Sequence, residues 1–342
     1  MEKKNPGEFR ASCLYLLAGI GLWAVGLAVQ LLSAPLSRMN TFALMLLVSV
    51  ACYFPFVLFP TIAAVWNTPD ALRLNPLPVG NALRVCVLAL LTVITAQNGT
   101  YLWLAILQKL GLNVFAVGTP VPTTRSELYL CLASAAILAP ICEELLFRGA
   151  MLSAWEARGG RRAVWITTIL FAMLHGSTEG LPAQLLAGVL LALVVLYTDS
   201  LYAGLIFHTV YNAGVTLLSY YESAQPVDAA QQALVQMDIF AALGGAAGVA
   251  SILVDLAIFG GIIWILMRRM RRSTELKAFL AAHEGGEMPK MEYREMLNAM
   301  KAYSPLRPAT ETAPLRTSTI LVLLAGIATA VVRYIADIIS ML

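Results

Sequence analysis

Three charged side chains interrupt an apolar stretch of the sequence, LAPICEELLFRGAML at residues 138–152. A charged group near the middle of a bilayer costs at least about 2.5–3.5 kcal/mol, so a chain rarely keeps one there without a use for it. Glu144 precedes Arg148 by four residues, which is the favourable order for an ion pair on one helix face. The spacing predicts a Glu144–Arg148 pair, with Glu143 about 100° further round the helix and available to another partner.

Two of the three histidines of the chain lie in neighbouring apolar segments. The segment FAMLH ends at His175, and HTVYN runs from His208 to Asn212, so that His208 and Asn212 are four residues apart and project from one helix face. A carboxylate and a neutral imidazole can activate water as a general base. Two imidazoles, an amide oxygen and a carboxylate can instead hold a divalent metal with an open position for water. Imidazole and amide groups can also donate hydrogen bonds to an oxyanion, and each alternative leads to hydrolysis of an acyl bond inside the membrane.

The positions of these residues along their helices indicate that they can meet. Glu143 and His175 lie about 22 Å and 20 Å from the hairpin WEARGGRR, which joins their two helices. His208 lies about 14 Å from the next turn on the same side, a difference that helix tilt can close. We therefore expect the polar groups to converge near the middle of the bilayer. The alternative interpretation is that these polar groups form a buried network that only holds the helices together and has no catalytic role.

The elements that carry these residues are long apolar blocks. The chain has 342 residues, 59% of them hydrophobic and 13% charged, against about 25% charged in ordinary soluble domains. Blocks of about 20 apolar residues are long enough to cross a bilayer as helices. The sequence predicts an all-α, polytopic transmembrane helical bundle of about nine spans, near residues 11–33, 42–66, 83–107, 128–157, 162–178, 181–198, 201–220, 239–267 and 318–340.

Lysine and arginine predict the orientation of this multi-pass membrane protein. With a cytoplasmic N-terminus, most of the 23 basic residues fall in cytoplasmic segments, as the positive-inside rule requires. The net charge of +3 therefore does not indicate a nucleic-acid partner, and none is expected; the basic residues cluster on the cytoplasmic side, where anionic membrane lipid attracts them. The five cysteines have no paired spacing, so neither a disulfide framework nor a zinc knuckle is expected. If the protein is bacterial, its location would be the cell membrane.

The motifs EELLFR, FAMLH and HTVYN together resemble the EExxxR, FxxxH and HxxxN motifs of the CPBP family of intramembrane proteases. These proteins are relatives of the CAAX prenyl endopeptidase Rce1 and are also called the Abi family. The resemblance covers about 100 residues, near 121–220, with the motifs in the family's order on successive spans. It implies peptide-bond hydrolysis within the membrane, on prenylated CAAX proteins in the eukaryotic members. Bacterial members are linked to bacteriocin self-immunity, peptide maturation and scaffolding.

The resemblance also implies roles for the motif residues. Glu143 would be the base that activates water, assisted by His175, while Glu144 and Arg148 would shape the site. His208 and Asn212 would bind the oxyanion or a metal. In the metalloprotease alternative a divalent ion such as zinc would be held by Glu143, His175, His208 and Asn212, whereas in the other alternative the enzyme is a metal-independent glutamate protease. The substrate would be a peptide or protein within the membrane.

Three regions follow from this pattern: a three-span region at 1–120, a catalytic core of four spans at 121–220, and a region at 221–342 with a long span, a basic segment and a final span. Two other functions stay open, a non-catalytic scaffold or bacteriocin-immunity protein and a proton-coupled transporter, since intramembrane Glu, His and Arg also form proton relays. One more intramembrane acid, Asp255, is expected to line the cavity or to pair with Arg333 and Asp337 on the last span.

Overall fold

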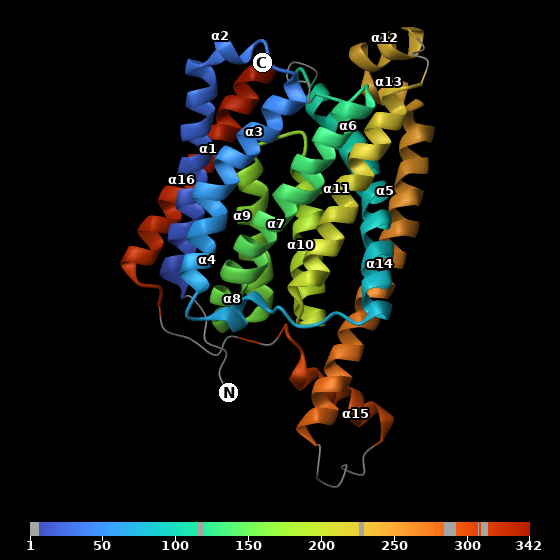
Figure 1. Cartoon of the computed structure of the whole chain (residues 1–342). Coiled ribbons are helices and arrows are strands. Elements are labelled where there is room, and N and C mark those ends of the chain that lie inside the picture. Colours follow the sequence, from blue (N-terminus) through green and yellow to red (C-terminus); the bar gives the residue numbers. More distant parts are fainter. Residues whose placement is uncertain (1–6, 115–119, 226–228, 284–291, 307, 309–313) are drawn as a thin grey trace.

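The computed structural model describes residues 7–114, 120–225, 229–283, 292–306, 308 and 314–342. Every regular element within these ranges is a helix, and the long helices stand side by side as a bundle (Figure 1). The predicted all-α fold is thereby confirmed. The longer helices are α1 Glu8–Leu31, α3 Thr41–Tyr53, α5 Val79–Lys109, α9 Gly160–His175, α10 Leu181–Thr198, α11 Leu201–Ser223, α14 Gly245–Ala282 and α16 Thr317–Met341.

Shorter helical segments complete or connect these helices. These segments include π-helices, which continue a neighbouring α-helix within one span, short 3-10 helices (both kinds are marked η) and short α-helices. They are α2 Ser33–Leu36, η1 Phe54–Leu58, α4 Phe59–Val65, η2 Pro69–Leu72, α6 Arg125–Cys131, η3 Leu132–Leu138, α7 Ala139–Glu144, η4 Leu145–Met151, α8 Leu152–Trp155, η5 Glu156–Arg158, α12 Ala229–Met237, α13 Ile239–Ala242, α15 Tyr293–Met300 and η6 Lys301–Tyr303.

Eight helices of the described residues are long and apolar enough to cross a membrane. They match eight of the nine predicted spans. The ninth, α9, has 16 residues and is about 24 Å long, short of a hydrocarbon core of about 30 Å. It nevertheless lies among the other helices, and α1 begins at the lower end of the bundle while α16 ends at the upper end (Figure 1). Because ends on opposite sides need an odd number of passes, α9 counts as a pass. The cytoplasmic position of the N-terminus stays a prediction.

Two predicted span boundaries are wrong for identifiable reasons. The span predicted at 162–178 ends at His175, because Gly176 takes a left-handed conformation (φ 60°) that caps α9. The span predicted at 239–267 corresponds to α14, which begins at Gly245, six residues after the predicted start, because Gly244 (φ 93°) separates it from α13. The helix then continues to Ala282, so the first part of the basic segment extends α14.

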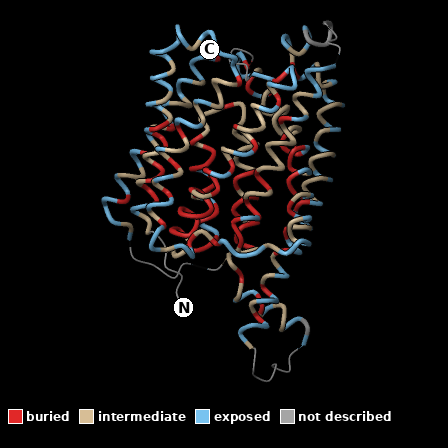
Figure 2. Tube along the Cα trace, viewed as in Figure 1, coloured by how far each residue is buried: buried red, intermediate tan, exposed pale blue. Residues whose placement is uncertain are grey.

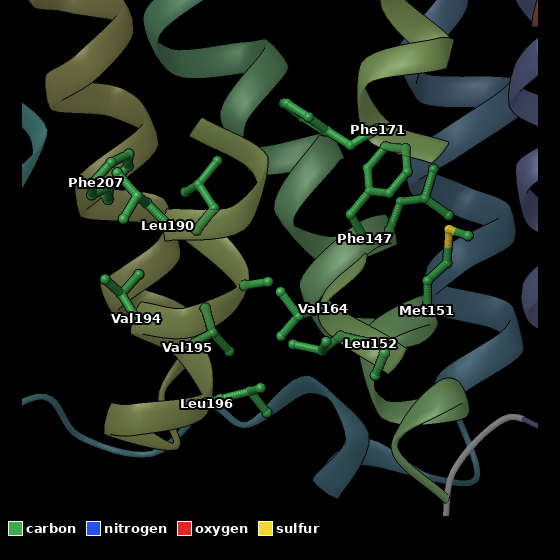
Figure 3. Close-up of a cluster of buried hydrophobic side chains, with 14 of the residues drawn as sticks. Phe147, Met151, Leu152, Val164, Phe171, Leu190, Val194, Val195, Leu196 and Phe207 are labelled. Atoms are coloured by element: carbon green, nitrogen blue, oxygen red, sulfur yellow. The ribbon is translucent and has the colours of Figure 1, made fainter. Parts of the chain in front are cut away.

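The buried residues follow the inner helices of the bundle (Figure 2). The main hydrophobic cluster joins side chains of α1, α5, α9, α10, α11 and α14 to those of the span that carries the two glutamates. Phe147, Leu152, Phe171, Val195 and Phe207 belong to this cluster and are shown in Figure 3. Exposed large hydrophobic side chains lie along most of the long helices, including α5, α9 and α11, as expected of a bundle whose outer surface faces lipid.

Candidate active site

The span that carries Glu143 and Glu144 is not a regular helix. Its six-residue segment α7 lies between two π-helical segments, η3 and η4. A π turn widens the helix and changes the direction of the side chains that follow, and such turns are frequent at functional sites. Pro140 is the second residue after η3, and it lacks the backbone N–H that a regular helix would use there. A third π segment, η1, follows Tyr53 in the span that packs beside this one.

The predicted Glu144–Arg148 ion pair is confirmed. Arg148 Nη1 lies 2.9 Å from Glu144 Oε1, and both side chains are fully buried, with 0% exposure. Arg148 also donates from Nη2 to the carbonyl oxygen of Gly188 at 3.2 Å. The guanidinium carbon lies 4.5 Å from the ring centroid of Phe171, a cation–π distance. The pair therefore fastens α7 and η4 to α10 and α9.

His208 connects the ion pair to the second glutamate. Its Nδ1 lies 2.9 Å from Glu144 Oε1, and its Nε2 lies 3.8 Å from Glu143 Oε2. A carboxylate accepts hydrogen bonds, so in the neutral imidazole the proton sits on Nδ1 and the Nε2 lone pair faces Glu143. The side chain is buried, at 3% exposure. Glu144 thus holds both the orientation and the tautomer of His208.

Glu143 has one oxygen engaged and one open. The hydroxyl of Tyr53 donates to Oε1. Oε2 is buried and receives no hydrogen bond from the described residues. The sequence gives little indication of Tyr53, because a tyrosine in an apolar span is ordinary and the contact bridges 90 positions. The only available signal is Pro55, two residues further on, which marks an irregular helix.

A glycine allows the buried carboxylate to approach α11. A Cβ atom at Gly204 would lie 2.6 Å from Glu144 Oε2 and 2.9 Å from Val195 Cγ2, both too close for ordinary contact. Gly204 precedes His208 by four residues, so both lie on the helix face that receives Glu144. The sequence analysis did not single out Gly204, although a glycine one helical turn before a candidate histidine can indicate that another side chain packs closely there.

His175 lies at the end of α9, one aromatic ring away from this group. Its Nδ1 lies 2.8 Å from the carbonyl oxygen of Phe171. The Phe171 ring centroid is 4.6 Å from that of His175 and 5.8 Å from that of His208. Among the contacts of the described residues, none joins His175 to Glu143. The imidazole that lies beside Glu143 is that of His208, and assistance by His175 stays a prediction.

The last span holds the end of α9 in place. Arg333 on α16 donates to the carbonyl oxygens of Leu174 and His175, the latter at 3.1 Å. Asp337 Oδ2 accepts from the backbone N–H of Thr178 at 2.7 Å. These partners replace the pairing with Asp255 that the sequence suggested, and that part of the prediction is wrong. Asp255 lies half-buried on α14 with no ion-pair partner among the described residues.

Asn212 binds backbone, not a side chain. Its Nδ2 donates to the carbonyl oxygen of Ala135 at 2.7 Å, which ties α11 to η3. One amide hydrogen and the amide oxygen are left for other partners. The residue therefore helps to hold the π turn that precedes Glu143, and it retains a donor that an oxyanion can use.

The arrangement does not fit a three-ligand zinc site. A catalytic zinc ion is usually held by three protein ligands, drawn from His, Cys, Asp and Glu. Within the described ranges no group of three or more such residues is placed so that it could hold a metal ion. The metal-dependent and metal-independent mechanisms both stay alternatives.

Comparison with known proteins agrees with this geometry. Residues 125–214 match the family described as type II CAAX prenyl endopeptidase Rce1-like. No curated protein and no solved structure matches the chain. The matched segment contains Glu143, Glu144, Arg148, His175, His208 and Asn212, whereas Tyr53 and Arg333 lie outside it. With its membrane-spanning helices the chain is a multi-pass integral membrane protein, and its residues 125–214 are similar to the Rce1-like family of type II CAAX prenyl endopeptidases.

Proposed function

We propose that the protein is an intramembrane endopeptidase in which Glu143 activates water. The observation that carries the proposal is the open oxygen of this buried carboxylate, 3.8 Å from the Nε2 atom of His208. Two acceptors at this distance are too far apart for a direct hydrogen bond and close enough to share one water molecule. A base positioned within hydrogen-bond reach of water is what general-base catalysis needs.

In the proposed reaction the water oxygen attacks the carbonyl carbon of the scissile peptide bond. Its proton passes to Glu143 Oε2, and the π electrons of the carbonyl move to its oxygen to form the oxyanion. The tetrahedral intermediate then collapses, the C–N bond breaks, and the proton on Glu143 passes to the leaving amine. The products are a carboxylic acid and an amine, so the atoms balance with water as the only co-reactant.

The neighbouring groups support this sequence of steps. Glu144 lies behind His208 and would stabilise a positive charge on its imidazole, as an acid does behind the histidine of a catalytic triad. Arg148 pairs with Glu144 where both side chains are fully buried, so its positive charge offsets that of the carboxylate behind His208. The remaining amide hydrogen of Asn212 is our candidate donor to the oxyanion. His175 would assist Glu143 from the far side of the Phe171 ring.

We propose membrane-associated proteins, including CAAX-like ones, as the substrate class. The support is the family match together with the burial of the catalytic groups inside a helical bundle. A soluble folded protein could not bring an extended peptide to such a site. Whether a prenyl group is needed is testable with one peptide prepared with and without the lipid.

Cleavage by purified protein tests the proposal. The full chain is reconstituted in liposomes with a fluorogenic CAAX-type peptide, and the variants Glu143→Gln, His208→Ala and His175→Ala are compared. Loss of the base predicts a decrease of about 10²–10⁴ in the cleavage rate. Glu222→Gln is the matched control, because Glu222 is exposed at the end of α11. Full activity of Glu143→Gln would overturn the assignment of the base, and ion flux without cleavage would favour a transporter.

The same preparation decides the metal question. If a metal ion activates the water, chelation removes the activity and added zinc restores it. His208→Ala would then also lower the metal content of the purified protein. We expect chelators to have little effect, because asparagine is not among the usual ligands of zinc. A stoichiometric metal ion that is lost in His208→Ala would contradict this expectation.

A further inference from the structure

A cavity of about 610 Å³ opens at the lower end of the bundle, away from the two glutamates. It lies between the end of α10, the extension of α14 beyond the other helices, and the segments α15 and η6 that fold back on that extension (Figure 1). The hydroxyl of Thr274 donates to the carbonyl oxygen of Tyr197, which fixes α14 against the end of α10. The cavity is therefore formed by elements that are packed together.

The lining of the cavity is strongly basic. Arg268, Arg271 and Arg272 come from α14, Arg294 from α15 and Lys301 from η6. Among the described residues of the lining, Glu275 is the only carboxylate, and it is buried and bonded to Arg271 at 2.7 Å. Within the described ranges, the arginines at 268, 272 and 294 have no carboxylate within ion-pair distance. These cations converge on one space without internal compensation, so the cavity favours an anion.

The opposite side of the cavity is apolar. Leu193, Trp264 and Met267 line the part nearest the middle of the bundle. Trp264 is 59% exposed, and the guanidinium of Arg268 lies 4.9 Å from its ring. Tryptophan is enriched where the hydrocarbon core meets the headgroup region. Above it, the exposed side chains Leu253, Val254, Ile258 and Ile262 form an apolar surface along α14.

We propose that this cavity binds the headgroup of an anionic phospholipid, with its acyl chains along α14. Along α14 an apolar surface is followed by a tryptophan and then by arginines. This is the order in which a phospholipid presents its acyl chains, its interfacial region and its phosphate. Basic pockets beside membrane helices bind such headgroups, and arginine binds phosphate through paired N–H donors. A soluble phosphate compound would use the same arginines but not the apolar side. This proposal is independent of the hydrolytic function.

Lipid retention by the purified full chain tests the site. Native mass spectrometry measures the binding of phosphatidylglycerol and of phosphatidylcholine with the same acyl chains, together with inorganic phosphate as a competitor. The variant Arg268→Gln/Arg272→Gln removes two cations from the cavity. The control Arg269→Gln/Lys277→Gln removes two cations from the same helix, at exposed positions that do not line this cavity. Each basic residue near a membrane surface is worth about fivefold in binding.

We expect phosphatidylglycerol to bind the unaltered protein at least about tenfold more tightly than phosphatidylcholine. The cavity variant should bind it about 30-fold more weakly, and the control at most a few-fold more weakly. Equal binding of the two lipids, or equal losses in the two variants, would overturn the proposal in favour of diffuse surface charge. Displacement of the lipid by millimolar phosphate would overturn it in favour of a site for soluble anions.

Discussion

Replacement of Arg148 by methionine removes the one cation from the buried group around Glu144. The two side chains are 0% exposed and their charged atoms are 2.9 Å apart. Without the arginine, the negative charge of Glu144 is buried with no arginine or lysine beside it among the described residues. Breaking a buried pair from one side costs about 3–5 kcal/mol. Methionine preserves most of the apolar volume, so the loss measures charge more than packing.

The same change in Glu143 should cost much less. Glu143→Gln keeps the shape of the side chain and the hydrogen bond from Tyr53. The charge that it removes has no arginine or lysine at ion-pair distance among the described residues; its one neighbour of this kind is His208, which is a cation only when its ring is protonated. We therefore expect Arg148→Met to lower the apparent Tm in detergent by on the order of 5 °C or more, and Glu143→Gln to change it by less than half of that.

A double variant separates charge from packing. In Glu144→Gln/Arg148→Met both charges are absent, and the glutamine oxygen can still accept from His208. Replacing both members of a buried pair is often close to neutral, whereas removing one is not. The double variant should therefore be more stable than Arg148→Met alone. If the double variant is as unstable as the sum of the two single changes, the ion pair is not what Arg148 contributes.

Three other positions give predictions of their own. Tyr53→Phe removes a hydrogen bond to the carboxylate of the general base and should slow cleavage by about 10- to 100-fold, with the peptide-cleavage rate as the measurement. Gly204→Ala places a methyl group against Glu144 and should cost about 1–3 kcal/mol in thermal unfolding, whereas Gly99→Ala, which has open space beside it, should be neutral or slightly stabilising. Arg333→Ala frees the end of α9 and should lower kcat with little change in KM; equal activity of the variant would show that α16 does not position His175.

Contacts within one helix were predictable from sequence. Helix periodicity places residues four apart on one face, and that rule alone gives the Glu144–Arg148 pair. Counting residues from the polar turns also predicted that Glu143 and His208 come together, and their nearest atoms are 3.8 Å apart. The apolar blocks located the helices, because a segment without water must satisfy its backbone hydrogen bonds internally.

Contacts between helices were not predictable, because they depend on how each helix is rotated. The π segments η3 and η4 change the side-chain directions on both sides of Glu143, and no sequence rule gives their positions. Tyr53 contacts Glu143 because of the rotation of these two helices, and the hydrophobic periodicity of either helix does not predict that its hydroxyl faces the carboxylate. The early end of α9 was missed for a different reason. The predicted span was drawn to residue 178 by its length and apolar composition, which do not show that Gly176, directly after His175, ends the helix.

The site depends on parts of the chain that carry no motif. The six motif residues lie within 125–214, yet the donor to Glu143 comes from α3 and the groups that hold the end of α9 come from α16. α16 packs along α1 and against α9, and α1 packs against η4, so the first and last helices together support the span with the two glutamates. The main hydrophobic cluster likewise joins residues from all three regions of the chain. Because the polar residues are buried in a core that these regions build jointly, a change in α3 or α16 acts on Glu143 or His175 as directly as a change in a neighbouring residue.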